Sequence, residues 1–181
     1  MIAPPGTRQM NWQSSDGFME TGTAILAKQT YGYISLGPRP IIGRDIQSCI
    51  QFLEGLPVVH PLLLLSNCPG FALSEEEERQ GLVFEAGNYR AVQQQRKDTG
   101  GLILSYVEEI AVGGIYLMHG LSAQYRVAAE NTIFYDTVPS RPPVPLQQVK
   151  ARGLLDEIVP LGTLELWLTT LLSKHNRLTE H

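Results

Sequence analysis

The residues with the most distinctive chemistry are two adjacent glycines, Gly113 and Gly114, followed by Ile115. They lie between a strand-like run and an apolar, helix-like run within residues 109–118. Glycines at such a step leave the backbone bare, and the first amides of a helix have no partner within it. Amides aligned with the helix dipole suit a developing negative oxygen. We therefore predict that these three residues are catalytic, although a glycine pair alone also fits a turn or close packing.

A second candidate turn comprises Pro69, Gly70 and Phe71. It follows the apolar run of residues 58–65, which is typical of a strand buried on both faces. The glycine pair follows a comparable run at residues 102–107. Ligands of open α/β sheets bind at the carboxyl ends of the strands. We therefore expect both turns to line one narrow acyl pocket, with the second turn contacting the substrate.

Side chains near these turns offer further chemistry. His119 lies one helical turn past the glycine pair, where it could act as an acid or base or be a satisfied helical histidine. Glu108 and Glu109 resemble the paired carboxylates of a hydratase, although exposed loop carboxylates are the simpler interpretation. We take Glu109 and His119 as candidate substrate-binding residues. Cys68 could be a thiol nucleophile only with a histidine nearby, and no spacing supports that arrangement.

The elements that must position these residues alternate along the chain. Runs of apolar residues and helical periodicity predict an α/β fold with right-handed crossovers between parallel strands. Residues 1–20 lack periodicity, so we expect an N-terminal arm there and a single domain at residues 21–181. The predicted strands are residues 24–27, 31–36, 58–65, 102–107, 125–129 and 132–135, and the predicted helices are residues 44–54, 75–97, 115–121 and 164–174.

The composition is that of an ordinary folded domain, with 43% hydrophobic and 18% charged residues among 181. The net charge of −4 and the lack of a basic block argue against nucleic-acid binding. Cys49 and Cys68 match no metal spacing and make no disulfide framework, so we expect no metal and a reduced, cytoplasmic setting. The longest apolar stretch is too short to span a bilayer, and no signal-peptide pattern opens the sequence.

Taken in order, several of these segments resemble the carboxyltransferase branch of the crotonase superfamily. The apolar strand with its Pro-Gly turn, the long helix, the second strand and the glycine pair follow one another as in that branch. The closer resemblance is to the gamma subunits of biotin-independent malonate decarboxylase, and it covers about residues 20–160. The segments that carry it are residues 22–26, 40–43, 61–71, 102–118 and 153–159.

The resemblance implies a crotonase-like superhelix of ββα units and a hetero-oligomer with an obligate beta subunit, the active site lying between the two. It implies a malonyl thioester on the CoA-like prosthetic group of an acyl carrier protein, and no cofactor bound covalently to this chain. Decarboxylation would leave an enolate, which the backbone N–H groups of Gly114 and Ile115 would stabilise. Whether those amides hold the enolate or the departing carboxylate stays open.

The sequence departs from that family's pattern in three places. Asn67 stands where the family has Asp, Val112 stands where it often has Ser, and the segment between Pro139 and Gly153 is short. A diverged, non-catalytic scaffold subunit therefore remains an alternative, and a crotonase-like acyl-CoA hydratase or isomerase is a second one. A Clp-type serine peptidase is excluded, because residues 112–118 contain no serine.

Overall fold

The computed structural model of the chain describes residues 10–15, 19–26, 29–72, 74–137, 139 and 141–179. Its centre is a seven-stranded sheet with the strand order β1-β2-β3-β4-β5-β7-β9. The pairings among β1, β2 and β3 are antiparallel, and those from β3 to β9 are parallel. The strands are β1 (Met10–Ser15), β2 (Met19–Leu26), β3 (Gln29–Leu36), β4 (Leu62–Ser66), β5 (Ile103–Val107), β7 (Tyr125–Ala129) and β9 (Glu157–Val159).

A second, two-stranded parallel sheet consists of β6 (Ile110–Val112) and β8 (Ile133–Tyr135). Two successive units share one arrangement: β5, β6 and α4 (Gly113–His119) are followed by β7, β8 and α5 (Leu146–Ala151). In each unit the first strand joins the large sheet and the second joins the small one. The predicted single-domain α/β class, built from ββα units, is confirmed.

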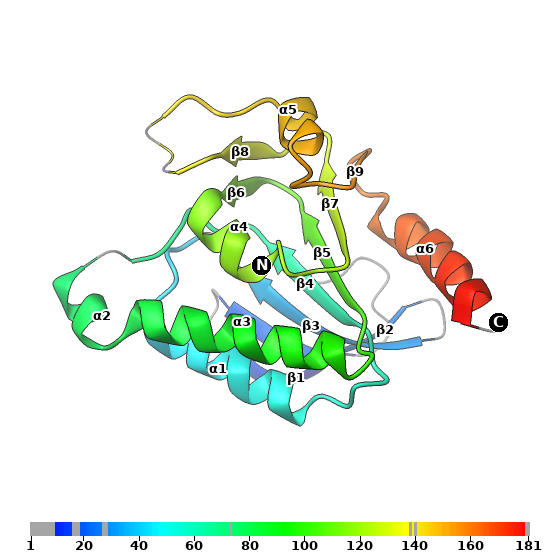
Figure 1. Cartoon of the computed structure of the whole chain (residues 1–181), viewed down its shortest axis with the longest axis horizontal. Coiled ribbons are helices and arrows are strands. Elements are labelled where there is room, and N and C mark those ends of the chain that lie inside the picture. The colour runs from blue at the N-terminus through cyan, green and yellow to red at the C-terminus, as the bar shows by residue number, and fades with distance from the viewer. Residues whose placement is uncertain are drawn as a thin grey trace.

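The other helices cover the two faces of the large sheet. α1 (Gly43–Gly55) and α3 (Leu82–Asp98) lie side by side on one face, as Figure 1 shows. α6 (Leu164–Thr179) packs against the residues of the opposite face through Trp167 and Leu168. The short α2 (Glu75–Arg79) precedes α3.

Strand β4 shows why this sheet is buried on both sides. Leu62 and Leu64 belong to the core cluster that contains residues of α1 and α3. Leu63 and Leu65 belong to the cluster that contains residues of α6. All four side chains are at most 1% exposed, and burying each one stabilises the fold by about 2 kcal/mol. The four consecutive leucines therefore form the central strand that the apolar run predicted.

The N-terminal region differs from the expected arm. Residues 10–15 form β1, which pairs with β2, and β2 already begins at Met19, before the predicted domain boundary. Strand pairing uses backbone groups, so a segment without apolar periodicity can still extend a sheet. Residues 1–9 and 16–18 of the predicted arm lie outside the described residues.

Three further differences concern element boundaries. The helix predicted over residues 75–97 is interrupted between α2 and α3, where Gly81 has a φ of 82°. The strand predicted from residue 58 begins only at Leu62, and Val59 is 80% exposed. The short elements β6, α5 and β9 were not predicted, because three to six residues carry too little periodicity to be recognised.

Candidate active site

The structure brings the two predicted turns together. A Cβ atom placed on Gly114 would lie 3.3 Å from the ring of Phe71, and one placed on Gly70 would lie 3.9 Å from the side chain of Val112. The first turn follows β4 and the second lies between β6 and α4. Residues predicted separately from two loops therefore form one surface.

The two glycines at the start of α4 occupy different environments. Gly113 is buried, and a Cβ atom on it would overlap the backbone carbonyl of Asp136, just after β8. Gly114 is exposed and faces Phe71. Close packing against the backbone therefore explains why position 113 is glycine. No backbone contact of this kind explains the glycine at the exposed position 114.

The first three N–H groups of α4 belong to Gly113, Gly114 and Ile115, the residues predicted as catalytic. The helix begins two residues earlier than predicted, and this shift places all three in its first turn. Ile115 is fully buried, so its side chain anchors the helix start in the core. Amides in the first turn of a helix have no carbonyl partner within the helix. Gly113 continues the ladder between β6 and β8, so the amides of Gly114 and Ile115 are the ones that this helix start can offer to an anion.

The Pro69–Phe71 turn is held in place by the segment before α1. Ile41 N–H donates to the Gly70 carbonyl at 2.9 Å, and Ala72 N–H donates to the Ile41 carbonyl at 2.9 Å. Gly70 has a φ of 138°, a conformation that other residues rarely adopt. Among the described residues, the N–H of Phe71 donates to no other group. The two hydrogen bonds to Ile41 therefore hold the turn in place, with the Phe71 ring beside Gly114.

Cys68 lies within the same loop but cannot serve as a nucleophile in its present environment. Its side chain is fully buried and its Sγ contacts the carbonyls of Arg39 and Gly70, each at 3.3 Å. Burial raises the pKa of the Cys68 thiol to about 11. Because the thiolate is the reactive form, the thiol stays inert at neutral pH.

Asn67 and Glu109 connect the loops that follow β4 and β5. The side-chain amide of Asn67 donates to a carboxylate oxygen of Glu109 at 2.8 Å. The backbone carbonyl of Glu109 accepts from Ile133 N–H at 2.8 Å, which fixes the loop against β8. An aspartate at position 67 would place a second negative charge next to Glu109. Asparagine, which replaces the aspartate of the family pattern, instead donates a hydrogen bond to that carboxylate.

Sequence reasoning did not predict that pairing. Asn67 and Glu109 each come one or two positions after the end of a buried strand. Because the carboxyl ends of neighbouring parallel strands lie at one edge of the sheet, this placement could have indicated that the two residues meet. Glu108 next to the pair is half-buried, and burial, followed by the charge of Glu109, raises the pKa of its carboxyl.

His119 lies in the core rather than at the surface that the turns form. Its side chain is fully buried, and its Nδ1 is 2.9 Å from the hydroxyl of Tyr89 on α3. Burial lowers the pKa of His119 to about 4, although the nearby backbone of Leu65 and Ile34 partly opposes this shift. The ring is therefore neutral at pH 7. This placement favours a core histidine over substrate binding, with Nδ1 paired to Tyr89 and Nε2 without a hydrogen-bond partner among the described residues.

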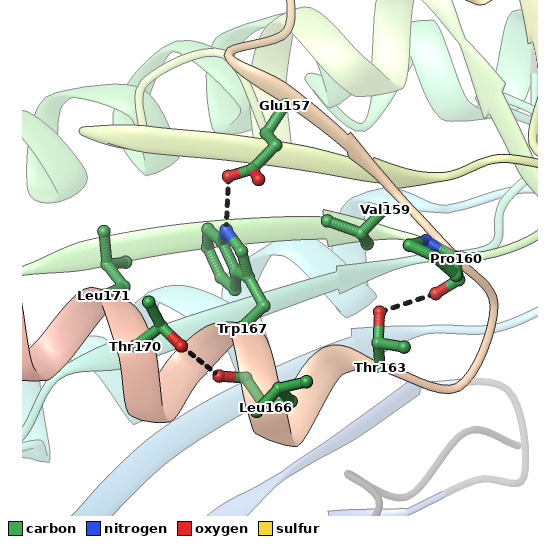
Figure 2. Close-up of a pocket in the computed structure, with 8 residues that line it drawn as sticks. All are labelled: Glu157, Val159, Pro160, Thr163, Leu166, Trp167, Thr170 and Leu171. Atoms are coloured by element: carbon green, nitrogen blue, oxygen red, sulfur yellow. Dashed lines mark hydrogen bonds between the residues drawn. The ribbon is translucent and has the colours of Figure 1, made fainter.

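A separate cavity of about 300 Å³ lies between β9 and α6 and contains none of the predicted site residues. The indole Nε1 of Trp167 donates to a carboxylate oxygen of Glu157 at 3.0 Å. Figure 2 shows the two side chains pointing toward each other. Thr163 and Thr170 donate to backbone carbonyls of Pro160 and Leu166. Because these polar groups are already paired, the cavity offers packing surface rather than a reaction centre.

Two further features are absent from the described part of the chain. Within it, no group of three or more His, Cys, Asp and Glu side chains could hold a metal ion. Its helices also include none with the length and apolar character needed to cross a membrane.

No protein-family model and no curated protein sequence matches the chain. Solved structures do match. Transcarboxylase 12S superimposes with a TM-score of 0.79 at 14% identity, over 93% of this chain and 39% of that one. The beta subunit of P. aeruginosa geranyl-CoA carboxylase gives 0.77 at 18% identity, over 91% and 38%.

A Pseudomonas malonate decarboxylase hetero-tetramer in complex with malonate gives a TM-score of 0.68 at 15% identity, over 88% of this chain and 80% of the matched chain. The present chain thus spans less than two fifths of the first two matched chains but most of the third. At these identities the likeness concerns the fold alone. The chain has the crotonase-like fold of the carboxyltransferases.

Proposed function

We propose that this chain is the gamma-type subunit of a decarboxylase that acts on a malonyl thioester together with a beta subunit. The thioester would be carried on the CoA-like prosthetic group of an acyl carrier protein. The carboxyltransferase fold supports the reaction class, and the match over 80% of a malonate decarboxylase chain supports the choice within it. The observation that carries the proposal is the exposed Gly114, in the first turn of α4 and against the Phe71 turn.

In the proposed reaction the C–C bond to the malonyl carboxylate breaks and carbon dioxide leaves. The bonding electron pair moves into the thioester, whose oxygen becomes the enolate oxygen. The N–H groups of Gly114 and Ile115 would donate to that oxygen, and the loss of one such donor costs about 3 kcal/mol of transition-state stabilisation. The enolate then takes up a proton at carbon to give the acetyl thioester.

Of the predicted substrate-binding residues, Glu109 could contact the substrate directly in this proposal, whereas His119 could not. Glu109 is exposed and held by Asn67, so its carboxylate is available to a bound substrate or to a proton. His119 is buried against Tyr89 and would act only by supporting α4. Pro69, Gly70 and Phe71 would form the wall opposite the helix start.

The test compares two substitutions at one position. Gly114→Pro removes one amide donor in the first turn of a helix, where proline is tolerated. Gly114→Ala keeps the donor and adds a Cβ 3.3 Å from the Phe71 ring, which a small ring movement accommodates. Carbon dioxide release from malonyl thioester is measured after mixing each variant with a candidate beta subunit.

We expect Gly114→Pro to lower turnover by about a hundredfold or more and Gly114→Ala to retain most of it. Heterodimer formation and circular dichroism should be unchanged in both. Full turnover by the proline variant would show that the Gly114 amide is not used.

The non-catalytic scaffold remains a second candidate, favoured by the Phe71 ring that lies against Gly114. Wild-type chain that forms a stable complex with the beta subunit, yet adds nothing to its carbon dioxide release, would support this alternative.

A further inference from the structure

A groove between α3 and the turn after α4 lies apart from the candidate active site. It has a volume of about 570 Å³ and is lined by Arg90, Gln94 and Lys97 on one side and by Leu121 and Ser122 on the other. The glycine pair begins α4, whereas the groove lies beyond its end. At 1.5 Å per residue, α4 separates the two by about 10 Å.

Small residues line part of the groove and leave space open there. Gly87 and Ala91 line it on α3, and a Cβ atom added to Gly87 would meet nothing within 4 Å. Its volume falls within the range typical of small-molecule sites, about 300–1,000 Å³. A hollow of this size suits a small ligand better than the surface of a folded partner.

The two cations of the groove are Arg90 and Lys97. In the described part of the chain, neither Arg90 nor Lys97 enters an ion pair. No Asp or Glu lies three or four residues from either on the helix. The carboxylate of Asp98 accepts a hydrogen bond from Gln94 at 2.7 Å. The helix dipole accounts for Lys97 in the last turn of α3 but not for Arg90 in its middle.

The opposite wall is fixed in place. Leu121 N–H donates to the Tyr116 carbonyl at 2.8 Å, and Ala123 N–H donates to the Gly120 carbonyl at 3.1 Å. Ser122 Oγ donates to the side chain of Gln93, which ties the turn to α3. The groove is therefore formed before any ligand binds, which limits the entropy lost on binding.

We propose that this groove binds a phosphate-bearing small molecule. Arg90 and Lys97 hold the phosphate groups, since a guanidinium pairs with two phosphate oxygens and an ammonium adds a mobile charge. Leu121 contacts the body of the ligand. Unpaired cations in a concave site attract such an anion even though the whole chain carries a net charge of −4.

The test is calorimetric titration of the chain alone with inorganic pyrophosphate and with ADP, at fixed ionic strength. We expect saturable binding of at least one probe, weakened at least tenfold by Arg90→Gln combined with Lys97→Gln. The matched control combines Arg44→Gln with Lys150→Gln, which removes two exposed cations outside the groove and should change binding less than twofold. If ADP binds tenfold more tightly than pyrophosphate, the groove recognises the organic part of the ligand as well as its phosphates. If the two probes bind equally, the groove recognises the diphosphate group alone.

Amide chemical shifts locate the ligand in the same samples. Changes at Ala91 and Leu121 support the groove. Changes confined to Gly114 and Ile115 would place the anion at the helix start and overturn the proposal, as would the absence of saturation up to about 10 mM. Equal weakening in the two double variants would mean unspecific counter-ion binding. None of these results depends on decarboxylase activity.

Discussion

Gly113 and Gly114 are adjacent, yet they lack side chains for different physical reasons. At Gly113 a side chain would collide with the backbone after β8, whereas at Gly114 it would meet only the edge of the Phe71 ring. Gly113 thus lets the small sheet approach α4, whereas Gly114 is exposed at the start of the helix. The glycine pair can therefore serve close packing at Gly113 and anion binding by the backbone at Gly114.

The hydrogen bond between Asn67 and Glu109 predicts how an added negative charge at position 67 changes stability. Asn67→Asp replaces a donor with a carboxylate beside Glu109, so it removes one hydrogen bond and adds repulsion. We expect urea unfolding at pH 7 to show a loss of about 1 kcal/mol or more. The loss should shrink in high salt, because Glu109 is exposed and its charge is screened.

Two further variants separate the causes. Asn67→Ala removes the hydrogen bond without adding charge and should cost less than Asn67→Asp. Combining Asn67→Asp with Glu109→Gln reverses the donor and the acceptor and should recover most of the lost stability. Wild-type stability of Asn67→Asp at pH 7 would mean that the bond contributes nothing in solution.

At the scale of elements, the separation of α2 from α3 depends on one backbone conformation. Gly81 adopts a left-handed conformation, with φ 82° and ψ 29°, directly before α3. The break lets α2 leave the axis of the long helix, and the Glu77 side chain accepts from Gly43 N–H at the start of α1 at 2.8 Å. The sequence predicted one continuous helix because a glycine inside a helical pattern does not reveal its φ.

We therefore expect the same substitution to have opposite effects at two glycines of this region. Gly81→Ala should lower the free energy of unfolding by about 1 kcal/mol, because alanine is strained in that conformation. Gly87→Ala lies inside α3 with open space around it and should raise the free energy by about 0.5–1 kcal/mol. Thermal unfolding of both variants measures the difference, and equal shifts would exclude the strained conformation.

At the scale of the whole molecule, sequence reasoning succeeded where burial leaves a local pattern. The four leucines of β4 are apolar on both faces, and the turn after them is set by Pro69 and Gly70. It failed where structure depends on contacts between distant segments. Gly113 packs on the carbonyl of Asp136 and Asn67 pairs with Glu109, and nothing within either local segment specifies its partner. β1 was missed for the same reason, because pairing with β2 defines it.

Burial of His119 should make the stability of the whole fold depend on pH. Its folded-state pKa of about 4 lies below the ordinary value of 6.5, so the unfolded chain binds the proton first as pH falls. Stability should therefore decrease between pH 6.5 and 4, by up to about 3 kcal/mol, since one unit of pKa corresponds to about 1.4 kcal/mol.

Denaturant unfolding across this range measures the effect in three proteins. His119→Gln can keep a hydrogen bond to Tyr89 but cannot titrate, so its stability should fall less steeply than that of wild type as the pH is lowered. His60→Gln changes a histidine in the loop after α1 and is the matched control. If wild type and His119→Gln lose stability in parallel, the imidazole is not neutral in the folded core. A difference that appears between pH 6.5 and 4 and is absent from the control would tie acid sensitivity to the residue that supports α4.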